Sequence, residues 1–430
     1  MSIPAAGDPS PSVNPVAAPQ TQAGPVGQHP EDRPRVGGGW VARYGLAYLG
    51  INLAWAAPSQ LLVALQLLEW SPDIKEARLA WVMGIGGLVS LVSTPLAGIL
   101  SDRTTSRFGR RRPWIALGAL VSALALVAMA YAPGYAVLLT SWAVFQFFIA
   151  FAVNASLAVA PDQVPRRQYG LVSGVLGLTY TLGLVLGTVI AEALPIRTAY
   201  LVTAALTVLL AGQFLLTTRD PQVSAAQLAD GREPADGWFP SPRRHPDYAW
   251  VWFTRLLVTL GNTVALFYLL YFLRDEVRLD DPGRGVLVLT IVYAATVVLT
   301  SVLSGRISDR MDRRLPFVST ASIGVAGACV VMAFAREWWV IVGAAVLLGA
   351  SWGVYMAVDQ ALINEVLPTA AHRGRDMSIM SLAVVLPNAL SPAVAAVALL
   401  HLGGYPGLYL LAGGLCALGA VLVHRVRGVR

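Results

Sequence analysis

The sequence predicts an all-α membrane protein, with twelve transmembrane helices arranged as two six-helix bundles. Three observations lead to this fold class: the apolar composition, the number of long apolar runs, and a charged motif that recurs about half a chain later. Of the 430 residues, 56% are hydrophobic and 13% are charged, and the mean hydropathy is +0.61. Soluble domains are much less apolar than this.

Twelve apolar runs are long enough to cross a bilayer, whose hydrocarbon layer of roughly 30 Å needs about 20 helical residues. The first six cover residues 43–68, 79–100, 114–132, 135–160, 170–193 and 198–217. The second six cover residues 248–274, 284–306, 316–335, 338–363, 376–399 and 405–424. Lipid offers no hydrogen-bond partners to the backbone, and the runs are too long for barrel strands, so each predicts an α-helix.

A charged stretch between the second and third runs has a second copy. Residues 98–113 read Gly-Ile-Leu-Ser-Asp-Arg-Thr-Thr-Ser-Arg-Phe-Gly-Arg-Arg-Arg-Pro, and residues 305–310 repeat the Gly-x-x-Ser-Asp-Arg core. A repeat at half the chain length indicates duplication. We therefore expect two related bundles, residues 43–217 and 248–424, as in many transporters.

Three polar segments lie outside the bundles. Residues 1–42, rich in Pro, Ala, Gly and Gln, predict a disordered tail, residues 218–247 predict a cytoplasmic linker, and residues 425–430 form a short C-terminal tail. Most of the 31 Lys and Arg residues fall in the tails and in alternate loops, which predicts that both termini are cytoplasmic. The net charge of +7 is thus topogenic rather than a sign of nucleic-acid binding.

A second pair of matched loops follows the fourth and tenth runs. Asp162 lies three residues before a proline, as does Glu365, and arginines stand close by at Arg167 and Arg373. A carboxylate at a helix end beside an arginine of a neighbouring loop can form a partly buried pair, which must break when that side of the protein opens.

These residues carry a family resemblance. Gly98-x-x-x-Asp102-Arg103 followed by Gly109-Arg110-Arg111 resembles the loop between helices 2 and 3 of the major facilitator superfamily. The longer stretch to Trp114, together with residues 161–165 and 365–376, resembles the branch of sucrose transporters and glycoside-pentoside-hexuronide cation symporters. The superfamily resemblance covers residues 43–424 and implies the major facilitator fold.

The resemblance implies that these loops latch the cytoplasmic side while the cavity opens outward. The predicted gate residues are Gly98, Asp102, Arg103, Arg110, Asp162, Arg167, Gly305, Asp309, Arg310, Arg313, Glu365 and Arg373. Gly98 and Gly305 would let a neighbouring helix approach closely. The alternative is that the basic triplet Arg110–Arg112 only anchors the topology.

Helices 1, 4, 7 and 10 line the central pathway in this superfamily, and their polar side chains are the candidate site. The predicted pathway residues are Asn52, Trp55, Gln60, Asn154, Arg255, Asn262, Trp352, Tyr355, Asp359 and Gln360, with Asn388 on helix 11. Arg255 and Asp359 are ionisable groups within apolar runs, so they should face the interior. They lie at similar depths and could pair.

Asp359 is the candidate for proton coupling, with Arg255 either tuning its pKa or binding a substrate hydroxyl or anion. The alternative is a static buried pair that fixes helices 7 and 10. The tryptophans and Tyr355 could stack on a sugar ring, but on membrane helices such side chains also serve in packing.

The resulting hypothesis is a proton-coupled secondary transporter of a small polar solute, a sugar or glycoside, acting as a monomer in the bacterial cytoplasmic membrane. Sodium is the alternative coupling ion. A drug or hydrophobic-metabolite exporter is the alternative function, although helix 5 lacks the Gly-Pro pair of drug antiporters. Helix 4 in turn lacks the arginine of sucrose symporters. No constellation for an enzyme, metal site or cofactor stands out, and the duplication argues against a channel.

Overall fold

The computed structural model describes residues 34–165, 168–218, 220, 245–311, 314–366 and 373–426. The side chains at positions 305–311, 360–361, 364–366 and 373–378 lie outside this description. All regular structure in the described residues is helical, and twelve helical spans are long and apolar enough to cross a membrane. The predicted fold class is confirmed.

The N-terminal bundle contains the first six spans. Its elements are α1 (Gly38–Ala57), the π-helical turn η1 (Pro58–Leu62), α2 (Val63–Trp70), α3 (Lys75–Arg103), α4 (Arg112–Ala130), α5 (Tyr135–Gln163), α6 (Tyr169–Ala193) and α7 (Ile196–Thr217). The first three form one continuous span, because Pro58 widens the helix by one turn without ending it.

The C-terminal bundle contains the other six. Its elements are α9 (Pro246–Phe267), α10 (Leu269–Asp275), α11 (Pro282–Met311), α12 (Leu315–Phe334), α13 (Trp338–Val366), α14 (Arg373–His401), α15 (Gly404–Leu422) and the 3-10 turn η3 (Val423–Arg425). The run predicted at 248–274 is therefore broken at Tyr268 into α9 and α10.

Two helices extend beyond the apolar runs from which they were predicted. The first helix begins at Gly38, so residues 38–42 belong to it rather than to the predicted tail. The second helix extends from Lys75 to Arg103, well beyond the predicted 79–100. Hydropathy marks only the part of a helix that lies in hydrocarbon, whereas polar ends continue into the interface.

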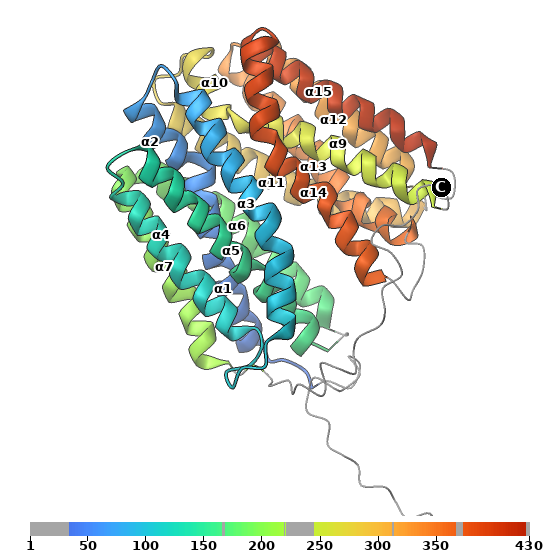
Figure 1. Cartoon of the computed structure of the whole chain (residues 1–430). Helices are drawn as coiled ribbons and strands as arrows, with labels where there is room; N and C mark the ends of the chain where they lie inside the picture. The colour runs from blue at the N-terminus through green and yellow to red at the C-terminus, as the bar shows by residue number, and fades with distance from the viewer. Residues whose placement is uncertain are drawn as a thin grey trace, which may run out of the picture.

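The two bundles lie side by side, with the N-terminal bundle in blue to green and the C-terminal bundle in yellow to red (Figure 1). Helix α3 packs on α14 and α6 packs on α11 across their interface. A Cβ at Gly87 would lie 2.7 Å from Ala389 Cα, so glycine is needed for the close approach of α3 and α14.

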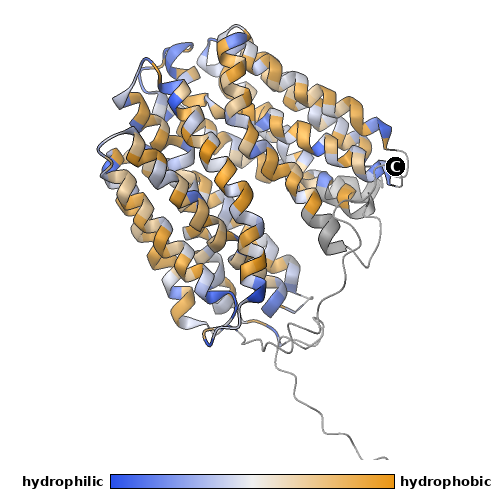
Figure 2. Ribbon diagram, in the orientation of Figure 1, coloured by the Kyte–Doolittle hydropathy of each residue, from blue (hydrophilic) through white to orange (hydrophobic). Residues whose placement is uncertain are grey.

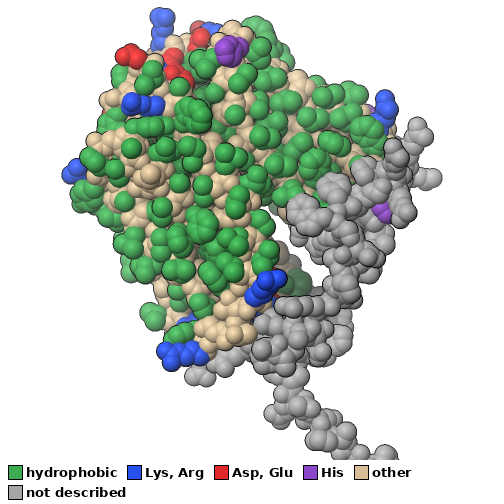
Figure 3. All heavy atoms as spheres, in the orientation of Figure 1, with side chains coloured by type: hydrophobic (Ala, Val, Ile, Leu, Met, Phe, Trp, Pro, Cys, Tyr) green, Lys and Arg blue, Asp and Glu red, His purple; other side chains and the backbone are tan. Residues whose placement is uncertain are grey.

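The outer faces of the helices are apolar over most of their length (Figure 2). Large hydrophobic side chains such as Leu88, Leu209 and Leu216 are exposed there. In the space-filling view, hydrophobic side chains cover the middle of the molecule, and the charged side chains in colour gather at its two ends (Figure 3). This arrangement is that of a multi-pass membrane protein, whose apolar girdle contacts lipid.

Candidate functional site: a central cavity between the two bundles

A cavity of about 600 Å³ lies where the two bundles meet. Side chains of α1, η1, α3, α5, α6, α9, α11, α13 and α14 contribute to its lining. Eight of the predicted pathway residues line it: Trp55, Gln60, Arg255, Asn262, Trp352, Tyr355, Asp359 and Asn388. The volume is within the roughly 300–1,000 Å³ of sites for small molecules.

Asn52 and Asn154 do not line this cavity. Each side-chain amide instead donates a 2.7 Å hydrogen bond to the carbonyl four residues earlier on its own helix, Asn52 to Tyr48 and Asn154 to Ala150. Their side chains thus bond to their own helices in this structure, and their role in the pathway stays a prediction. The side chain of Gln360 lies outside the described residues.

The two charged side chains in the described lining of the cavity are in contact. Arg255 Nε on α9 lies 3.5 Å from Asp359 Oδ2 on α13, and the two side chains are 12% and 5% exposed. The Tyr355 hydroxyl donates a hydrogen bond of 3.2 Å to the other carboxylate oxygen, Oδ1. A carboxylate this buried needs such partners, because an isolated charge in an apolar interior is unfavourable.

An aromatic pair lies beside this ion pair. The rings of Trp352 and Tyr355 are stacked, with centroids 5.3 Å apart and an interplanar angle of 18°. Asn262 is only 4% exposed, and its Oδ1 has no hydrogen-bond partner among the described residues. The cavity thus offers a flat apolar surface, an ion pair and an amide with unused hydrogen-bonding capacity, which together suit a ring-shaped polar solute.

Several lining residues were missed from the sequence. Tyr180 on α6, Tyr293 on α11, and Ser90 and Thr94 on α3 all line the cavity. They belong to helices 5, 8 and 2, which the family pattern does not place along the pathway. Only the tilt and rotation of these helices bring their side chains to the cavity, so no local pattern could have identified them.

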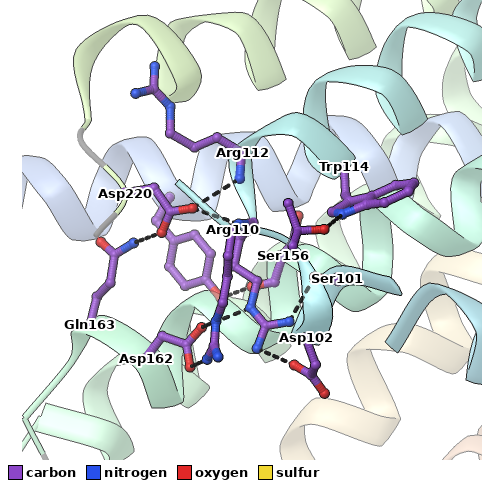
Figure 4. A network of polar contacts seen from close by, with 12 residues as sticks. Ser101, Asp102, Arg110, Arg112, Trp114, Ser156, Asp162, Gln163 and Asp220 are labelled. Atoms are coloured by element: carbon purple, nitrogen blue, oxygen red, sulfur yellow. Dashed lines mark hydrogen bonds and ion pairs between the residues drawn. The ribbon is translucent and has the colours of Figure 1, made fainter. Parts of the chain in front are cut away.

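At one end of the N-terminal bundle, the loop between α3 and α4 (residues 104–111, here the signature loop) forms a charged network (Figure 4). Arg110 contacts Asp162 through Nη2 at 2.5 Å and Nε at 3.2 Å. Arg111 binds the same carboxylate through Nε at 2.8 Å, and its other nitrogens reach Asp102 and Ser101, each at 2.7 Å. Arg111, for which the sequence left a latch role and a topology anchor both open, is therefore the centre of the network.

Asp220, immediately after the last helix of this bundle, joins the same network. Its Oδ2 accepts hydrogen bonds from the backbone N–H groups of Arg111 at 2.6 Å and Arg112 at 3.2 Å, and its Oδ1 accepts one from Gln163 at 3.1 Å. It thereby caps α4, whose own N-cap residue provides no side-chain bond. Burial raises the pKa of Asp220, while the two backbone N–H groups oppose that shift.

The close contact of Asp220 explains the glycine of the loop. Gly109 has a φ of +92°, and a Cβ there would lie 2.3 Å from Asp220 Cβ. A larger residue would be strained and would clash. The sequence analysis predicted only a linker at this position, and it missed Asp220 because this contact spans more than a hundred residues.

The structure places only some of the predicted gate residues in this network. Asp102, Arg110 and Asp162 belong to the network, all within one bundle. Among the described residues, nothing lies within 4 Å of a Cβ built at Gly98, and Arg103 is exposed. Lying outside the described residues or side chains are Arg167, Gly305, Asp309, Arg310, Arg313, Glu365 and Arg373.

A second polar cluster, absent from the sequence predictions, lies at the opposite end of α3. Lys75 Nζ lies 3.1 Å from Glu76 and 2.9 Å from Asp275 of the C-terminal bundle. The hydroxyls of Tyr268 and Tyr271 donate to the carbonyls of Glu76 and Ala64, at 2.9 and 3.1 Å. Among described residues, the hydrogen bonds and ion pairs that join the two bundles all lie in this cluster.

Solved structures with the same fold include the nucleoside transporter NupG, with a TM-score of 0.71 and 11% identity, covering 90% of this chain and 99% of that one. A POT family transporter in complex with a thioalcohol-conjugated peptide gives a TM-score of 0.72 at 10% identity, covering 90% and 95%. At this level of identity, the similarity is one of fold.

Sequence relatives include the general alpha-glucoside permease of Schizosaccharomyces pombe, 36% identical over 93 residues, and the sucrose transport protein SUC4 of Arabidopsis thaliana, 34% identical over 124 residues. The matches cover 20% and 27% of this chain but only 15% and 22% of those proteins. An uncharacterized MFS-type transporter of Mycobacterium tuberculosis is 25% identical over 372 residues, covering 81% of this chain and 84% of that protein.

These partial matches confirm the resemblance to the sucrose-transporter branch. The family model described as Major Facilitator Superfamily matches residues 41–291 and 251–429, which together include all of the twelve spans except the first three residues of the first one. Members of this family are transporters of small molecules rather than enzymes. The chain belongs to the Major Facilitator Superfamily.

Proposed function

We propose that the protein moves a small polar solute, a sugar or glycoside, across the bacterial cytoplasmic membrane by proton-coupled alternating access. The observation that carries this proposal is the buried Arg255–Asp359 pair in a cavity between two bundles. A charged pair in the membrane interior is unfavourable to bury, and it is found where ions or substrates pass.

The arrangement of the bundles supports alternating access. Among the described residues, the polar contacts between the bundles gather around Lys75, whereas the contacts of Arg110 and Arg111 lie within one bundle. The bundles separate toward the signature-loop end (Figures 1 and 3). We place this end in the cytoplasm, because most basic loop residues lie on its side. The conformation is then inward-facing, closed at the outer end by the Lys75 cluster.

Asp359 is the proposed coupling residue. Its carboxylate is the acidic side chain among the described residues of the cavity lining, and it is held by Arg255 and Tyr355. Protonation would release Arg255, whereas deprotonation would restore the ion pair. A single side chain could thus link proton binding to the state of the cavity.

The sugar substrate is supported by two independent points. Partial relatives are named for sucrose and alpha-glucoside transport. The stacked rings of Trp352 and Tyr355 offer a flat apolar surface of the kind on which sugar rings pack. The rival substrate is a drug-like molecule, for which the many aromatic side chains of the lining are equally suited.

The test is uptake into proteoliposomes with an imposed pH gradient, comparing labelled sucrose and maltose with the cation ethidium. We expect accumulation of a sugar by the wild-type protein when the outer side is acidic. For Asp359→Asn, we expect sugar exchange without accumulation. Movement of ethidium alone would favour the exporter. Sugar accumulation driven equally well by a sodium gradient at constant pH would exclude the proton as the specific coupling ion.

A further inference from the structure

The central cavity does not extend equally into the two bundles. In each bundle, the third and sixth spans pack on helices of their own bundle: α4 and α7 in the first, α12 and α15 in the second. No residue of α4 or α7, which are both fully described, lines the cavity. Helices α12 and α15 do contribute to the lining, with Ala328, Cys329, Met332 and Tyr409. The cavity therefore reaches past the inner helices into the core of the C-terminal bundle.

The walls of this extension are apolar. We call it the side lobe and define it by six lining residues: Leu289, Ala328, Met332, Ala344, Leu348 and Tyr409. All six belong to one buried hydrophobic cluster and are at most 7% exposed. The helices that carry them pack on one another in the order α11, α13, α12 and α15. Apolar cavities in protein interiors bind compact apolar molecules such as benzene.

The side lobe directly adjoins the polar part of the cavity. On each of three helices, an apolar lining residue lies four positions from a polar or aromatic one: Leu266 and Asn262 on α9, Leu289 and Tyr293 on α11, Leu348 and Trp352 on α13. Residues four apart share a helix face and are separated by about 6 Å along the axis. Because α9 runs opposite to α11 and α13, all three apolar members lie nearer the Lys75 end.

This spacing suits a solute made of a polar ring and an apolar group. A sugar ring stacked on Trp352 and Tyr355 would have the side lobe about one helical turn away, on the side of Leu348. In a glycoside, the sugar ring and its aglycone are joined through a single oxygen atom, so the two groups are direct neighbours. One glycoside could thus occupy both parts of the cavity.

We propose that the side lobe is a binding site for the aglycone of a glycoside, a compact apolar group such as propyl or phenyl. The sugar ring then lies against Trp352 and Tyr355, with its hydroxyls toward Asn262. A free sugar leaves the side lobe unused, so the protein prefers glycosides with an apolar aglycone. Such a solute is neutral, which is consistent with the proposed role of Asp359 in proton coupling.

This inference rests on the proposed transport of a sugar or glycoside and narrows it to one class of substrate. The test measures dissociation constants from ligand-dependent thermal stabilisation of the full chain. The protein is reconstituted in lipid nanodiscs, so that no sugar-based detergent competes for the cavity. The probes are glucose and its methyl, propyl and phenyl glucosides, with both anomers of each glucoside.

The wild-type protein should bind more tightly as the aglycone grows. Each methylene group transferred from water into an apolar site strengthens binding by about fourfold. We therefore expect propyl glucoside to bind about tenfold more tightly than methyl glucoside, and phenyl glucoside at least as tightly as propyl glucoside. Glucose itself should bind no more tightly than methyl glucoside.

A variant that fills the side lobe should remove this preference. Ala328→Leu should weaken the binding of propyl and phenyl glucoside by about tenfold more than that of methyl glucoside. The matched control is Ala125→Leu on α4. Ala125 is buried and lies thirteen residues after Arg112, as Ala328 lies thirteen after Leu315, but Ala125 does not line the cavity. The control should keep the wild-type preference.

A second variant decides the question if Ala328→Leu fails to fold. Leu348→Ala enlarges the side lobe, so it should accept a longer aglycone. We expect hexyl glucoside to gain affinity over propyl glucoside, relative to the wild-type ratio, by about fourfold for each further methylene group that enters the lobe. An unchanged ratio of hexyl to propyl affinity would count against the site.

Equal affinity of the wild-type protein for methyl, propyl and phenyl glucoside would overturn the inference. So would equal losses in Ala328→Leu and Ala125→Leu, or no binding of any glucoside. Accumulation of sucrose or maltose in proteoliposomes without any effect of the aglycone on binding would remove the site and keep the proposed function. Binding with the expected effects of the variants, but without transport of any sugar or glucoside, would keep the site and remove the proposed function.

Discussion

The two ends of helix α3 carry polar clusters of opposite design. At its Arg103 end, the signature loop brings Arg110 and Arg111 to Asp162, and Asp220 accepts hydrogen bonds from the backbone of the same loop. These residues lie in the N-terminal bundle or just after its last helix. At its Lys75 end, the ion pair with Asp275 and the tyrosine hydrogen bonds cross to the C-terminal bundle.

This difference indicates which contacts must break when the bundles move relative to each other. A network inside one bundle moves with it as a unit, so it stabilises the bundle in every conformation. Contacts between bundles are made in one conformation and lost in another, so they set the balance between the two. We infer that the signature loop stabilises the N-terminal bundle internally. The Lys75 cluster, in contrast, holds the two bundles together at the Lys75 end of α3.

The largest effect is expected for Arg111→Gln. Its guanidinium is 6% exposed, and its loss leaves Asp162 and Asp102 without their shared partner. Breaking a buried pair on one side is strongly destabilising, here by about 3 kcal/mol. Thermal unfolding in detergent measures the loss. The control is Arg103→Gln, an exposed position, and equal stability of the two variants would contradict the bracing role.

A smaller loss is expected for Asp220→Ala, which removes the cap of α4. Loss of an N-cap side chain destabilises a helix by about 1–2 kcal/mol. Asp220→Asn retains a side-chain oxygen acceptor, so it should recover most of the stability in the same unfolding assay. If the alanine and asparagine variants unfold with similar stability, the hydrogen bonds from the backbone of Arg111 and Arg112 to Asp220 do not contribute to the stability of the protein.

Asp275→Asn should alter the conformational balance rather than the stability of either bundle. The Lys75–Asp275 pair is partly buried, so its loss should favour opening by about 1 kcal/mol, roughly a fivefold change in population. Lys75 is the only lysine of the chain, so modification of its amine by an acylating reagent, followed by peptide mass spectrometry, reports the opening.

The matched control for this experiment is Glu276→Gln, whose partner Arg336 belongs to the same bundle. We expect the labelling rate of Lys75 to rise in Asp275→Asn and to remain unchanged in Glu276→Gln. Equal labelling in both variants would mean that the pair between bundles does not hold this end closed.

The smallest effect is expected for Tyr271→Phe, which loses one hydrogen bond between the bundles, to Ala64. A net contribution of about 0.5–1 kcal/mol predicts an increase in Lys75 labelling of about two- to fivefold. Tyr200→Phe removes a hydrogen bond to Gln66 inside the N-terminal bundle and is its counterpart. That variant should lower thermal stability without changing the labelling of Lys75. Faster labelling of Lys75 in Tyr200→Phe, with no loss of stability, would contradict the distinction between contacts inside a bundle and contacts between the bundles.

The sequence by itself determined the twelve helices and the presence of a buried Arg255 and Asp359. Hydrocarbon thickness fixes the length of each apolar run, and the unfavourable burial of charge directs ionisable side chains inward. Tertiary structure decided the rest. Which arginine of the triplet is central, the turning of Asn52 and Asn154 onto their own helices, and the meeting of Lys75 with Asp275 depend on how helices rotate and pack, because contacts between distant segments leave no local pattern.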